Sequence, residues 1–287
     1  MNNAPQSGWL IIGEFMSDES YLEPFAEVYD LLFGKESEVA FGKIVDKLYS
    51  STGCGKRNKV VLDLGCGTGT LLQWFCENGY KGIGIDASSA MLSRAKAKLQ
   101  PYLERGQAHL LCADVTSFEL TDAMGRPGIV LSSGEVFQLL NATQLQQTIH
   151  CALGKMEPDG FIATVFTGIS PCISLVRESE DFFCVEQSHC DGIHIDIHRI
   201  GFQRTGDGNT YRRWKNVDRL HLHSPLKVAE LFRNAGAAGI SLSRIDGDNL
   251  HPLQPDFADW KAINYAVIAS PTITEPLATT GKIKPTP

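Results

Sequence analysis

A glycine-rich segment between two apolar runs constrains the fold of this chain more than any other feature. Residues 60–69 read Val-Val-Leu-Asp-Leu-Gly-Cys-Gly-Thr-Gly, and residues 82–86 read Gly-Ile-Gly-Ile-Asp. This order is typical of a buried strand, a tight turn, a helix and a second buried strand. Because glycines lack a Cβ and accept positive φ, a ligand can contact the backbone N–H groups of such a turn. Asp86, at the end of the second strand, stands where a carboxylate accepts hydrogen bonds from ribose hydroxyls. The segment therefore predicts a nucleoside-binding site.

The spacing of the glycines indicates which nucleoside the site takes. A dinucleotide-binding loop needs the pattern Gly-x-Gly-x-x-Gly. Here the third glycine, Gly69, comes one residue early, and Thr70 occupies the place where that pattern requires glycine. The spacing therefore disfavours an NAD-dependent oxidoreductase, which is one alternative for such a loop. A non-catalytic cofactor-binding subunit is a second alternative.

From residue 59 onward, apolar runs of strand length alternate with helical patterns. Strands separated by helices argue for a parallel sheet that is covered on both faces. The chain is therefore predicted to be an α/β protein with a doubly wound, mostly parallel sheet, preceded by helices at about 21–33 and 38–49. The predicted strands are 59–64, 82–86, 108–112, 128–133, 160–166, 238–245 and 262–269.

A β-rich stretch interrupts this alternation. Residues 182–187, 193–202 and 211–222 are predicted to be strands, with turns at Asp191-Gly192 and Gly206-Asp207-Gly208. Such segments form antiparallel hairpins. The chain is expected to divide into a flexible N-terminal segment (1–18), a core with its N-terminal helices (19–168 and 223–270), a β-rich insertion (169–222) and a disordered tail (271–287).

The pattern Asp-x-Gly-x-Gly-x-Gly at residues 63–69 resembles motif I of the class I S-adenosylmethionine-dependent methyltransferases. The resemblance implies a seven-stranded Rossmann-like sheet whose last strand is antiparallel, with S-adenosyl-L-methionine as cofactor and S-adenosyl-L-homocysteine as product. The insertion resembles the lid of small-molecule methyltransferases, such as the glycine and sugar-amine N-methyltransferases. The implied activity is methyl transfer to a small-molecule metabolite. N-methylation is favoured, and O- or C-methylation of an aromatic or polyketide-like product stays open.

The same resemblance assigns residues to the cofactor. It implies that the glycine loop contacts the methionine and ribose parts, that Asp86 binds the ribose and that Asp114 binds the adenine amino group. Met91 completes an aspartate-x-serine-x-x-methionine pattern over 86–91, which places it against the adenine. Taken alone, Asp114 is equally a helix cap or turn residue, and the alternative for Met91 is an ordinary core residue. The expected cofactor residues are Tyr29, Asp63, Gly65, Cys66, Gly67, Thr68, Gly69, Asp86, Ala87, Met91, Asp114, Val115, Ser132 and Ser133.

No indispensable catalytic residue is predicted. The sulfonium group is already a strong methyl donor, so the protein mainly has to position the reactants. A general base is needed only where the nucleophile arrives protonated. The substrate-side candidates are Glu135, Gln138, Tyr29 and His194. In the family, a tyrosine like Tyr29, followed by an aspartate, covers the methionine end of the cofactor. An aromatic residue on a helical stripe is also an ordinary core residue.

The insertion contains the sequence His-Ile-Asp-Ile-His at 194–198. On a strand, both imidazoles and the carboxylate share one face. That face is a metal site, a wall toward the substrate, or the solvated side of a half-buried strand whose isoleucines point inward. The last interpretation is favoured and no metal site is predicted. Arg199, the next residue, is a candidate for gripping a carboxylate or an aromatic ring, and a surface charge is the favoured interpretation.

Composition limits the partners. The formal net charge of −7 provides no basic field for a nucleic-acid backbone. No apolar run approaches membrane-spanning length, and the N-terminus lacks the pattern of a signal peptide. The eight cysteines form no Cys-x-x-Cys pair, so we expect reduced thiols in a cytoplasmic protein. The expected partner is a small-molecule substrate, without nucleic acid or membrane, and the chain is expected to be a monomer or a homodimer.

Overall fold

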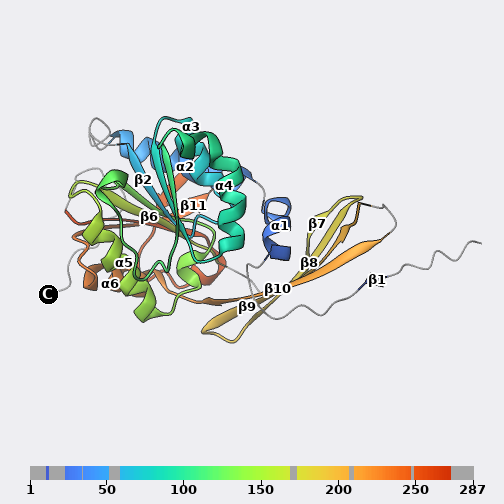
Figure 1. Ribbon diagram of the computed structural model, residues 1–287. Coiled ribbons are helices and arrows are strands. Elements are labelled where there is room, and N and C mark those ends of the chain that lie inside the picture. Colours follow the sequence, from blue (N-terminus) through green and yellow to red (C-terminus); the bar gives the residue numbers. More distant parts are fainter. Residues whose placement is uncertain are drawn as a thin grey trace, which may run out of the picture.

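The computed structural model describes residues 11–12, 23–33, 35–51, 59–168, 173–206, 210–246 and 249–272. These residues form two β-sheets with flanking helices (Figure 1). Most of the N-terminal segment expected to be flexible, and most of the expected tail, lie outside the described residues.

The larger sheet contains all seven strands expected from the sequence and an eighth at its edge. Five strands are parallel, and the last strand, β13, pairs antiparallel with both of its neighbours, as the resemblance implied. The eighth strand, β12, is short and was not predicted. In order across the sheet, the strands are β12 (Asn249–Pro252), β11 (Gly239–Asp246), β13 (Tyr265–Ser270), β6 (Phe161–Phe166), β5 (Ile129–Ser132), β2 (Val60–Leu64), β3 (Lys81–Asp86) and β4 (Ala108–Cys112).

The strand order reverses beside β2. From β2 the chain runs outward to β3 and β4, and it then crosses back to β5 and β6 on the other side of β2. In an open α/β sheet, ligands bind outside the carboxyl ends of the strands at such a reversal. Because β2 ends at Leu64 and the glycine loop comes directly after it, the topology places this loop at the crevice.

Helices cover both faces of the larger sheet (Figure 1). On one face, Val61 packs in an apolar cluster with α2 (Lys35–Ser51), α3 (Thr70–Glu77) and α4 (Ser89–Glu104). On the other, Leu62 packs with α5 (Ala142–Lys155) and α6 (Pro225–Asn234). Since β2 is buried on both faces, its sequence is apolar throughout except at Asp63. In the part of the chain that the structure describes, no helix has the length and apolar character needed to cross a bilayer.

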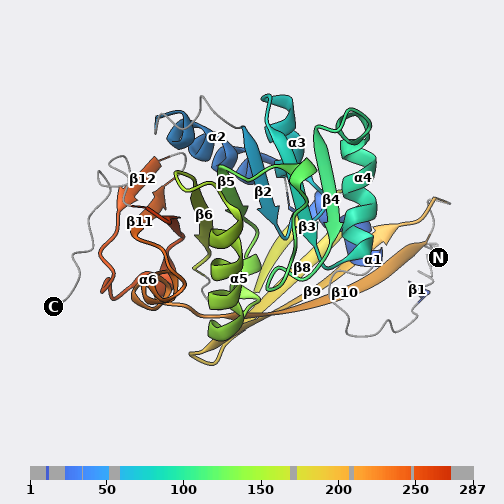
Figure 2. The same cartoon turned by 60° about the vertical axis from the view of Figure 1, so that its left-hand side comes forward.

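The smaller sheet contains the β-rich insertion, called the lid here. Its strands β7 (Ile173–Glu178), β8 (Phe182–Cys190), β9 (His194–Arg204) and β10 (Tyr211–His221) pair antiparallel in chain order. Strand β7 adds to the three strands predicted. Ile11 and Ile12, in the segment expected to be flexible, form β1, which pairs with β10 in parallel. Figure 2 shows the lid as a long ribbon that extends past α1.

Helix α1 (Glu23–Leu32) lies between α4 and the lid (Figure 1). Phe25 packs in one apolar cluster with Met91 of α4 and with Phe182 and Trp214 of the lid. The rings of Phe25 and Trp214 lie 5.8 Å apart, and those of Trp214 and Phe182 stack at 5.9 Å. The apolar stripe that predicted this helix is thus an interface with both neighbours.

Candidate active site

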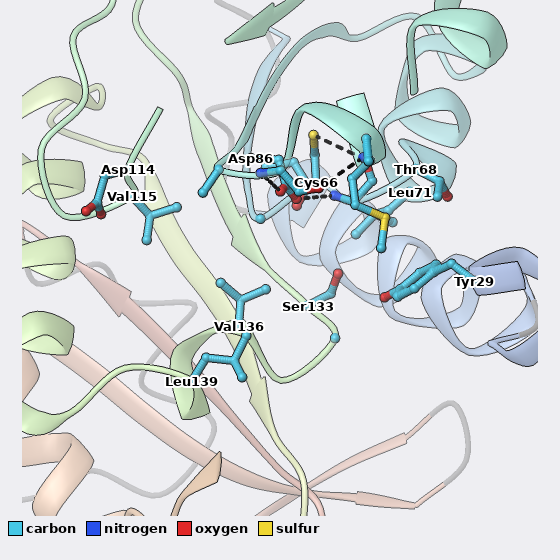
Figure 3. A pocket seen from close by; sticks show the side chains of 18 of the residues that line it. Tyr29, Cys66, Thr68, Leu71, Asp86, Asp114, Val115, Ser133, Val136 and Leu139 are labelled. Carbon is cyan, nitrogen blue, oxygen red and sulfur yellow. Dashed lines mark hydrogen bonds between the residues drawn. The ribbon is translucent and has the colours of Figure 1, made fainter. Parts of the chain in front are cut away.

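A cavity of about 500 Å³ lies at the carboxyl ends of β2, β3, β4 and β5, where the strand order predicts a ligand site (Figure 3). The expected cofactor residues that line it are Tyr29, Asp63, Gly65, Cys66, Gly67, Thr68, Asp86, Ala87, Met91, Asp114, Val115 and Ser133. Further lining residues, which were not predicted, are Glu38, Leu71, Ser88, Ser89, Ala90, Gly134, Val136, Leu139, Leu140 and Gln144.

The three glycines of the loop have positive φ, but they have different neighbours. Gly65, at φ 73°, faces Val136, and a Cβ at this position would come within 2.4 Å of that side chain. Gly67, at φ 53°, faces the cavity, and the nearest atom to its Cβ position belongs to Tyr29 at 3.9 Å. Gly69, at φ 79°, packs against Ala95 of α4 and does not line the cavity. Only Gly65 and Gly67 therefore leave backbone open to a ligand.

Asp86 is held in a fixed orientation at the end of β3. Its Oδ2 accepts a hydrogen bond from the backbone N–H of Gly67 at 2.8 Å, and its Oδ1 accepts one from the N–H of Ser88 at 2.8 Å. Burial raises the pKa of Asp86, and these two hydrogen bonds lower it. A carboxylate oxygen accepts more than one hydrogen bond, so the group can still bind hydroxyls from the cavity.

Asp63 is the one polar side chain of β2, and it is 1% exposed. Its Oδ1 lies buried at the cavity without a hydrogen-bond partner among the described residues. Burial raises its pKa to about 8, and the nearby carboxylates of Glu38 and Asp86 add to that shift. Leaving a buried polar atom unpaired costs free energy. The atom is therefore a ready partner for a donor or a cation in the cavity.

Asp114 and Val115 lie at one end of the cavity and Tyr29 at the other (Figure 3). The Oδ1 of Asp114 accepts a hydrogen bond from the N–H of Thr116 at 2.8 Å, which is the turn role that its sequence position also allowed. The Tyr29 hydroxyl is directed toward Ser133 (Figure 3). Burial raises the pKa of Tyr29 well above its ordinary value, with Glu38 next in effect.

The residue after Tyr29 anchors α1 to the glycine loop. The Oδ1 of Asp30 accepts a hydrogen bond from the Thr68 hydroxyl at 2.6 Å, and the Lys98 ammonium pairs with the same carboxylate at 2.7 Å. Lys98 also donates to the hydroxyls of Thr68 and Thr70. The Tyr-Asp pair is therefore built from one side chain in the cavity and one that fixes the helix.

Glu38 is a cavity residue that sequence reasoning missed. It accepts a hydrogen bond from the backbone N–H of Leu71 at the start of α3, and burial raises its pKa to about 7. A signal was present, because Glu38 shares its helical face with the core residues Phe41 and Val45. A carboxylate on an apolar stripe needs an explanation.

The cavity lining is acidic. Four of its side chains are carboxylic acids (Glu38, Asp63, Asp86 and Asp114), and no lysine, arginine or histidine is among the described lining residues. Like charges in a site of low dielectric repel. This lining suits a ligand that carries positive charge, and it opposes a pyrophosphate.

Several candidates named from the sequence lie outside the cavity lining. Ser132 is buried, and its hydroxyl has no partner in the described residues. Gln138 makes two hydrogen bonds to the Thr167 backbone, at 3.1 and 2.6 Å, which hold the end of β6. Glu135 comes directly after the lining residue Gly134 without lining the cavity itself.

Residues 194–198 have the arrangement of the favoured interpretation, with the isoleucines inward. Ile195 and Ile197 are buried, while His194 pairs with Asp191 at 3.3 Å and Asp196 makes a two-pronged ion pair with Arg219. Within the described ranges, no group of histidine, cysteine, aspartate and glutamate side chains could hold a metal. His194 is therefore not brought to the cavity.

The favoured prediction that Arg199 is a surface charge is wrong. It is 3% exposed, and it pairs with Glu186 at 2.8 Å and with the buried Asp218. It has the same alternation as Ile195 and Ile197, so it points to the buried side of β9.

Comparisons with known proteins agree with this geometry. A family described as "Methyltransferase domain" matches residues 61–160, which contain the glycine loop, Asp86 and Asp114. A carboxy-S-adenosyl-L-methionine synthase of Shewanella loihica is 25% identical over 206 residues, covering 69% of this chain and 77% of that protein. A putative methyltransferase of Bacillus subtilis, YqeM, is 26% identical over 239 residues, covering 78% and 88%.

Solved structures share the fold. The sugar N-methyltransferase KedS8 from Streptoalloteichus superposes with a TM-score of 0.67 at 18% identity, over 92% of this chain and 99% of that one. At this identity the likeness concerns the fold alone. The family match over residues 61–160 and the curated relatives, together with the glycine loop, indicate that this chain is a class I S-adenosylmethionine-dependent methyltransferase.

Proposed function

We propose that this enzyme transfers the methyl group of S-adenosylmethionine to a nitrogen atom of a small-molecule amine. The observation that carries the proposal is the charge of the cavity, which has four carboxylic acids and no basic side chain among its described lining residues. An amine is the acceptor class that gains from acidic surroundings. KedS8, which shares the fold, is described as a sugar N-methyltransferase. An alcohol or an aromatic carbon gains nothing comparable from these carboxylates.

The hydrogen-bond acceptors of the cavity fit the cofactor. The unpartnered Oδ1 of Asp63 would accept a hydrogen bond from the cofactor's amino group, which relieves a buried unpaired atom. Asp86, already oriented by Gly67 and Ser88, would hold the ribose hydroxyls. Asp114 and Val115 would then contact the adenine, and Tyr29 would cover the methionine end. These assignments follow the order of the labelled residues along the cavity, from Asp114 at one end through Asp86 to Tyr29 at the other (Figure 3).

When bound, the cofactor supplies an electrophilic methyl group on a positively charged sulfur. The chain's own contribution is to orient the acceptor against that group and to exclude water. Together these effects can lower the activation barrier by roughly 7–11 kcal/mol. Tyr29, which contacts Phe25 and through it the lid residue Trp214, would close the methionine end. Transfer removes the positive charge from the sulfur, so the acidic cavity is expected to hold the product less tightly than the substrate.

Labelled methyl transfer tests the proposal. The protein is incubated with a metabolite pool and with S-adenosylmethionine that carries a ¹³C methyl group, and products are analysed by NMR and mass spectrometry. We expect the label on nitrogen. Label on the oxygen or ring carbon of an aromatic product would contradict N-methylation while leaving methyl transfer intact. If no pool supports S-adenosylhomocysteine release above background, the chain is a cofactor-binding subunit.

Net charge and lid position support the remaining parts of the proposal. A chain with a net charge of −7 is repelled by nucleic-acid phosphates, so the acceptor is expected to be a free small molecule. Residues 169–222 are proposed to close over this acceptor, while the core binds the cofactor. Size-exclusion chromatography with light scattering would decide between a monomer and a homodimer.

A further inference from the structure

Glu135 has an unusual backbone conformation beside the cavity. Its φ is 69° and its ψ is 6°, and no other described non-glycine residue has a positive φ. Residues with a side chain adopt this left-handed region at a cost, and they persist in it where the surroundings demand it. Its neighbours in the chain, Gly134 and Val136, both line the cavity. The Glu135 carboxylate does not itself line the cavity, and it lies within electrostatic reach of three residues of the lid.

The groups around this carboxylate come from three different parts of the fold. The Thr167 side chain, after β6, hydrogen-bonds to it. Arg199 of β9 attracts it, and Asp218 of β10 and Glu186 of β8 repel it. From α1, Tyr29 also interacts with it electrostatically. Glu135 thus lies where the main sheet, α1 and the lid meet.

Arg199 is the centre of a buried polar network in the lid. Its Nε donates to Glu186 at 2.8 Å, and its Nη1 donates to Asn216 at 3.0 Å and to Asp218. Asn216 and Asp218 are each 3% exposed. The strand register supports this contact, since Arg199 pairs directly with Glu186 on one side and with Asn216 on the other. The network fixes the guanidinium in one place.

An aromatic contact connects this network to the cavity. The guanidinium carbon of Arg199 lies 5.1 Å from the centre of the Phe33 ring, and that ring lies 4.8 Å from the ring of Tyr29. Tyr29 lines the cavity, and a Cβ on Gly134 would lie 3.6 Å from its hydroxyl. Tyr29 and the loop of Glu135 therefore lie next to each other at the same end of the cavity.

The charges in this region do not balance. Glu135, Glu186 and Asp218 are three carboxylic acids, and Arg199 is the one cation among the described residues that act on Glu135. A buried carboxylate without a matching positive charge is unfavourable. Consistent with this, burial raises the pKa of Glu135 to about 7 despite the opposing effect of Arg199. A positively charged group placed beside Glu135 would restore the balance.

We propose that Glu135 binds the ammonium group of the acceptor and takes the proton that this nitrogen must lose before it can be methylated. The inference rests on the proposed function and identifies the acceptor as an amine that arrives protonated. The N–H bond breaks and the proton passes to the Glu135 carboxylate. The freed lone pair forms the N–C bond as the C–S bond breaks, and the bonding electrons of C–S stay on sulfur. The product leaves as an N-methylammonium ion and Glu135 returns its proton to water. Arg199 acts as a positioning residue that holds Glu186 and Asp218.

A direct test monitors the ionisation of Glu135 by NMR in protein with ¹³C-labelled glutamate carboxyls. The signal is assigned by its loss in Glu135→Gln, and S-adenosylhomocysteine is kept bound. Methylammonium chloride is the probe, because it is small enough to enter any space that admits an amine. We expect it to lower the apparent pKa of Glu135, since an opposite charge favours the ionised form. Methanol, and potassium chloride at equal ionic strength, are expected to leave the pKa unchanged. No response to methylammonium overturns the proposal.

Turnover of the amine that the labelled-methyl screen identifies provides the second test. Glu135→Gln is expected to lower the rate on the order of 100-fold and to abolish its rise with pH near 7, while the affinity for S-adenosylmethionine stays within about twofold. Glu135→Asp, which keeps the carboxylate, is expected to recover part of the rate. Glu119→Gln, at an exposed site, is the matched control. N-methylation by Glu135→Gln at the unaltered rate and pH profile would overturn this inference alone. A label on oxygen or carbon would overturn the proposed function.

Discussion

The backbone N–H of Gly67 donates a 2.8 Å hydrogen bond to the Asp86 carboxylate, so the glycine loop and the end of β3 form one unit. The loop after β2 and the acid that ends β3 are 19 residues apart in sequence. Each orients the other before any ligand arrives. Such preorganisation lowers the cost of binding, because the ordering is already complete.

Replacing Asp86 by asparagine is expected to weaken S-adenosylmethionine binding about 10- to 100-fold. The amide has one accepting oxygen, so it cannot serve Gly67, Ser88 and the ribose together. Losing a hydrogen bond to a charged group costs about 1.5–3 kcal/mol, and about 1.4 kcal/mol corresponds to tenfold in affinity. Titration calorimetry measures this change. Asp181→Asn, on the exposed lid surface, is the control, and equal affinities for both variants would contradict the role of Asp86.

Gly67→Val is expected to abolish cofactor binding. The branched side chain would enter the cavity at a backbone position with φ 53°. Gly106→Val introduces a similar backbone strain at φ 66°, but no atom lies within 4 Å of its Cβ position. It therefore separates the effect of backbone strain from the effect of filling the cavity. Both variants should lose about 1–2 kcal/mol of unfolding free energy, and only Gly67→Val should lose the cofactor. Binding by Gly67→Val would mean that the glycine loop serves only as a structural turn.

The cofactor-free protein is expected to lose stability as the pH rises from about 4 to about 8. Burial raises the pKa of Asp63 to about 8, so the folded protein retains a proton that the unfolded chain has released. The stability due to the neutral acid is complete below the unfolded pKa, near 4, and disappears as the pH passes the folded pKa. Glu38, with a pKa raised to about 7, acts in the same direction.

Asp63→Asn stays neutral at every pH, so its stability should depend less on pH across that window. Urea unfolding at the two ends of the range measures the difference. The same variant should bind S-adenosylmethionine more weakly, because it removes the carboxylate assigned to the amino group. A pH dependence unchanged by this substitution would show that Asp63 is ionised in the free protein.

Gly201→Ala is expected to destabilise the contact of the lid with α1. A Cβ at residue 201 would come within 2.1 Å of the Trp214 ring, which packs with Phe25 and Phe182. Overpacking of this kind costs about 1–3 kcal/mol. Gly206→Ala, with nothing within 4 Å, is the control. Thermal unfolding of both variants measures the cost, and equal midpoints would show that the indole moves freely.

The main sheet was predictable because a strand buried on both faces is a nearly continuous apolar run, as in β2 and β5. Strands β1, β7 and β12 were not predicted, because short or irregular strands at sheet edges carry no such run. Gly128, which opens the predicted strand 128–133, lies against α2. A Cβ there would lie 2.5 Å from the Tyr49 hydroxyl, so the packing of α2 requires the glycine.

The acidic residues of the cavity were predictable where they lie at strand ends, whereas the helix residues Tyr29 and Met91 were predicted from the family resemblance. Asp63 and Asp86 lie in the last two positions of β2 and β3, and Asp114 comes two residues after the end of β4. Glu38 comes from a helix whose position over α3 no local pattern indicates. Arg199 was misassigned because charged residues are usually exposed, although its alternation with Ile195 and Ile197 placed it inward. Its buried partners, on β8 and β10, become visible only once the strands are paired.

The acidic cavity beside the glycine loop is expected, above all, to hold a positively charged sulfonium cofactor. Titration calorimetry of the unmodified protein with S-adenosylmethionine, S-adenosylhomocysteine and NADH tests this most directly. We predict that S-adenosylmethionine binds and that NADH does not bind. At higher pH, where the carboxylic acids are ionised, S-adenosylhomocysteine should bind more weakly than S-adenosylmethionine. Tight binding of NADH with none of S-adenosylmethionine would contradict the assignment of the cavity to a sulfonium cofactor.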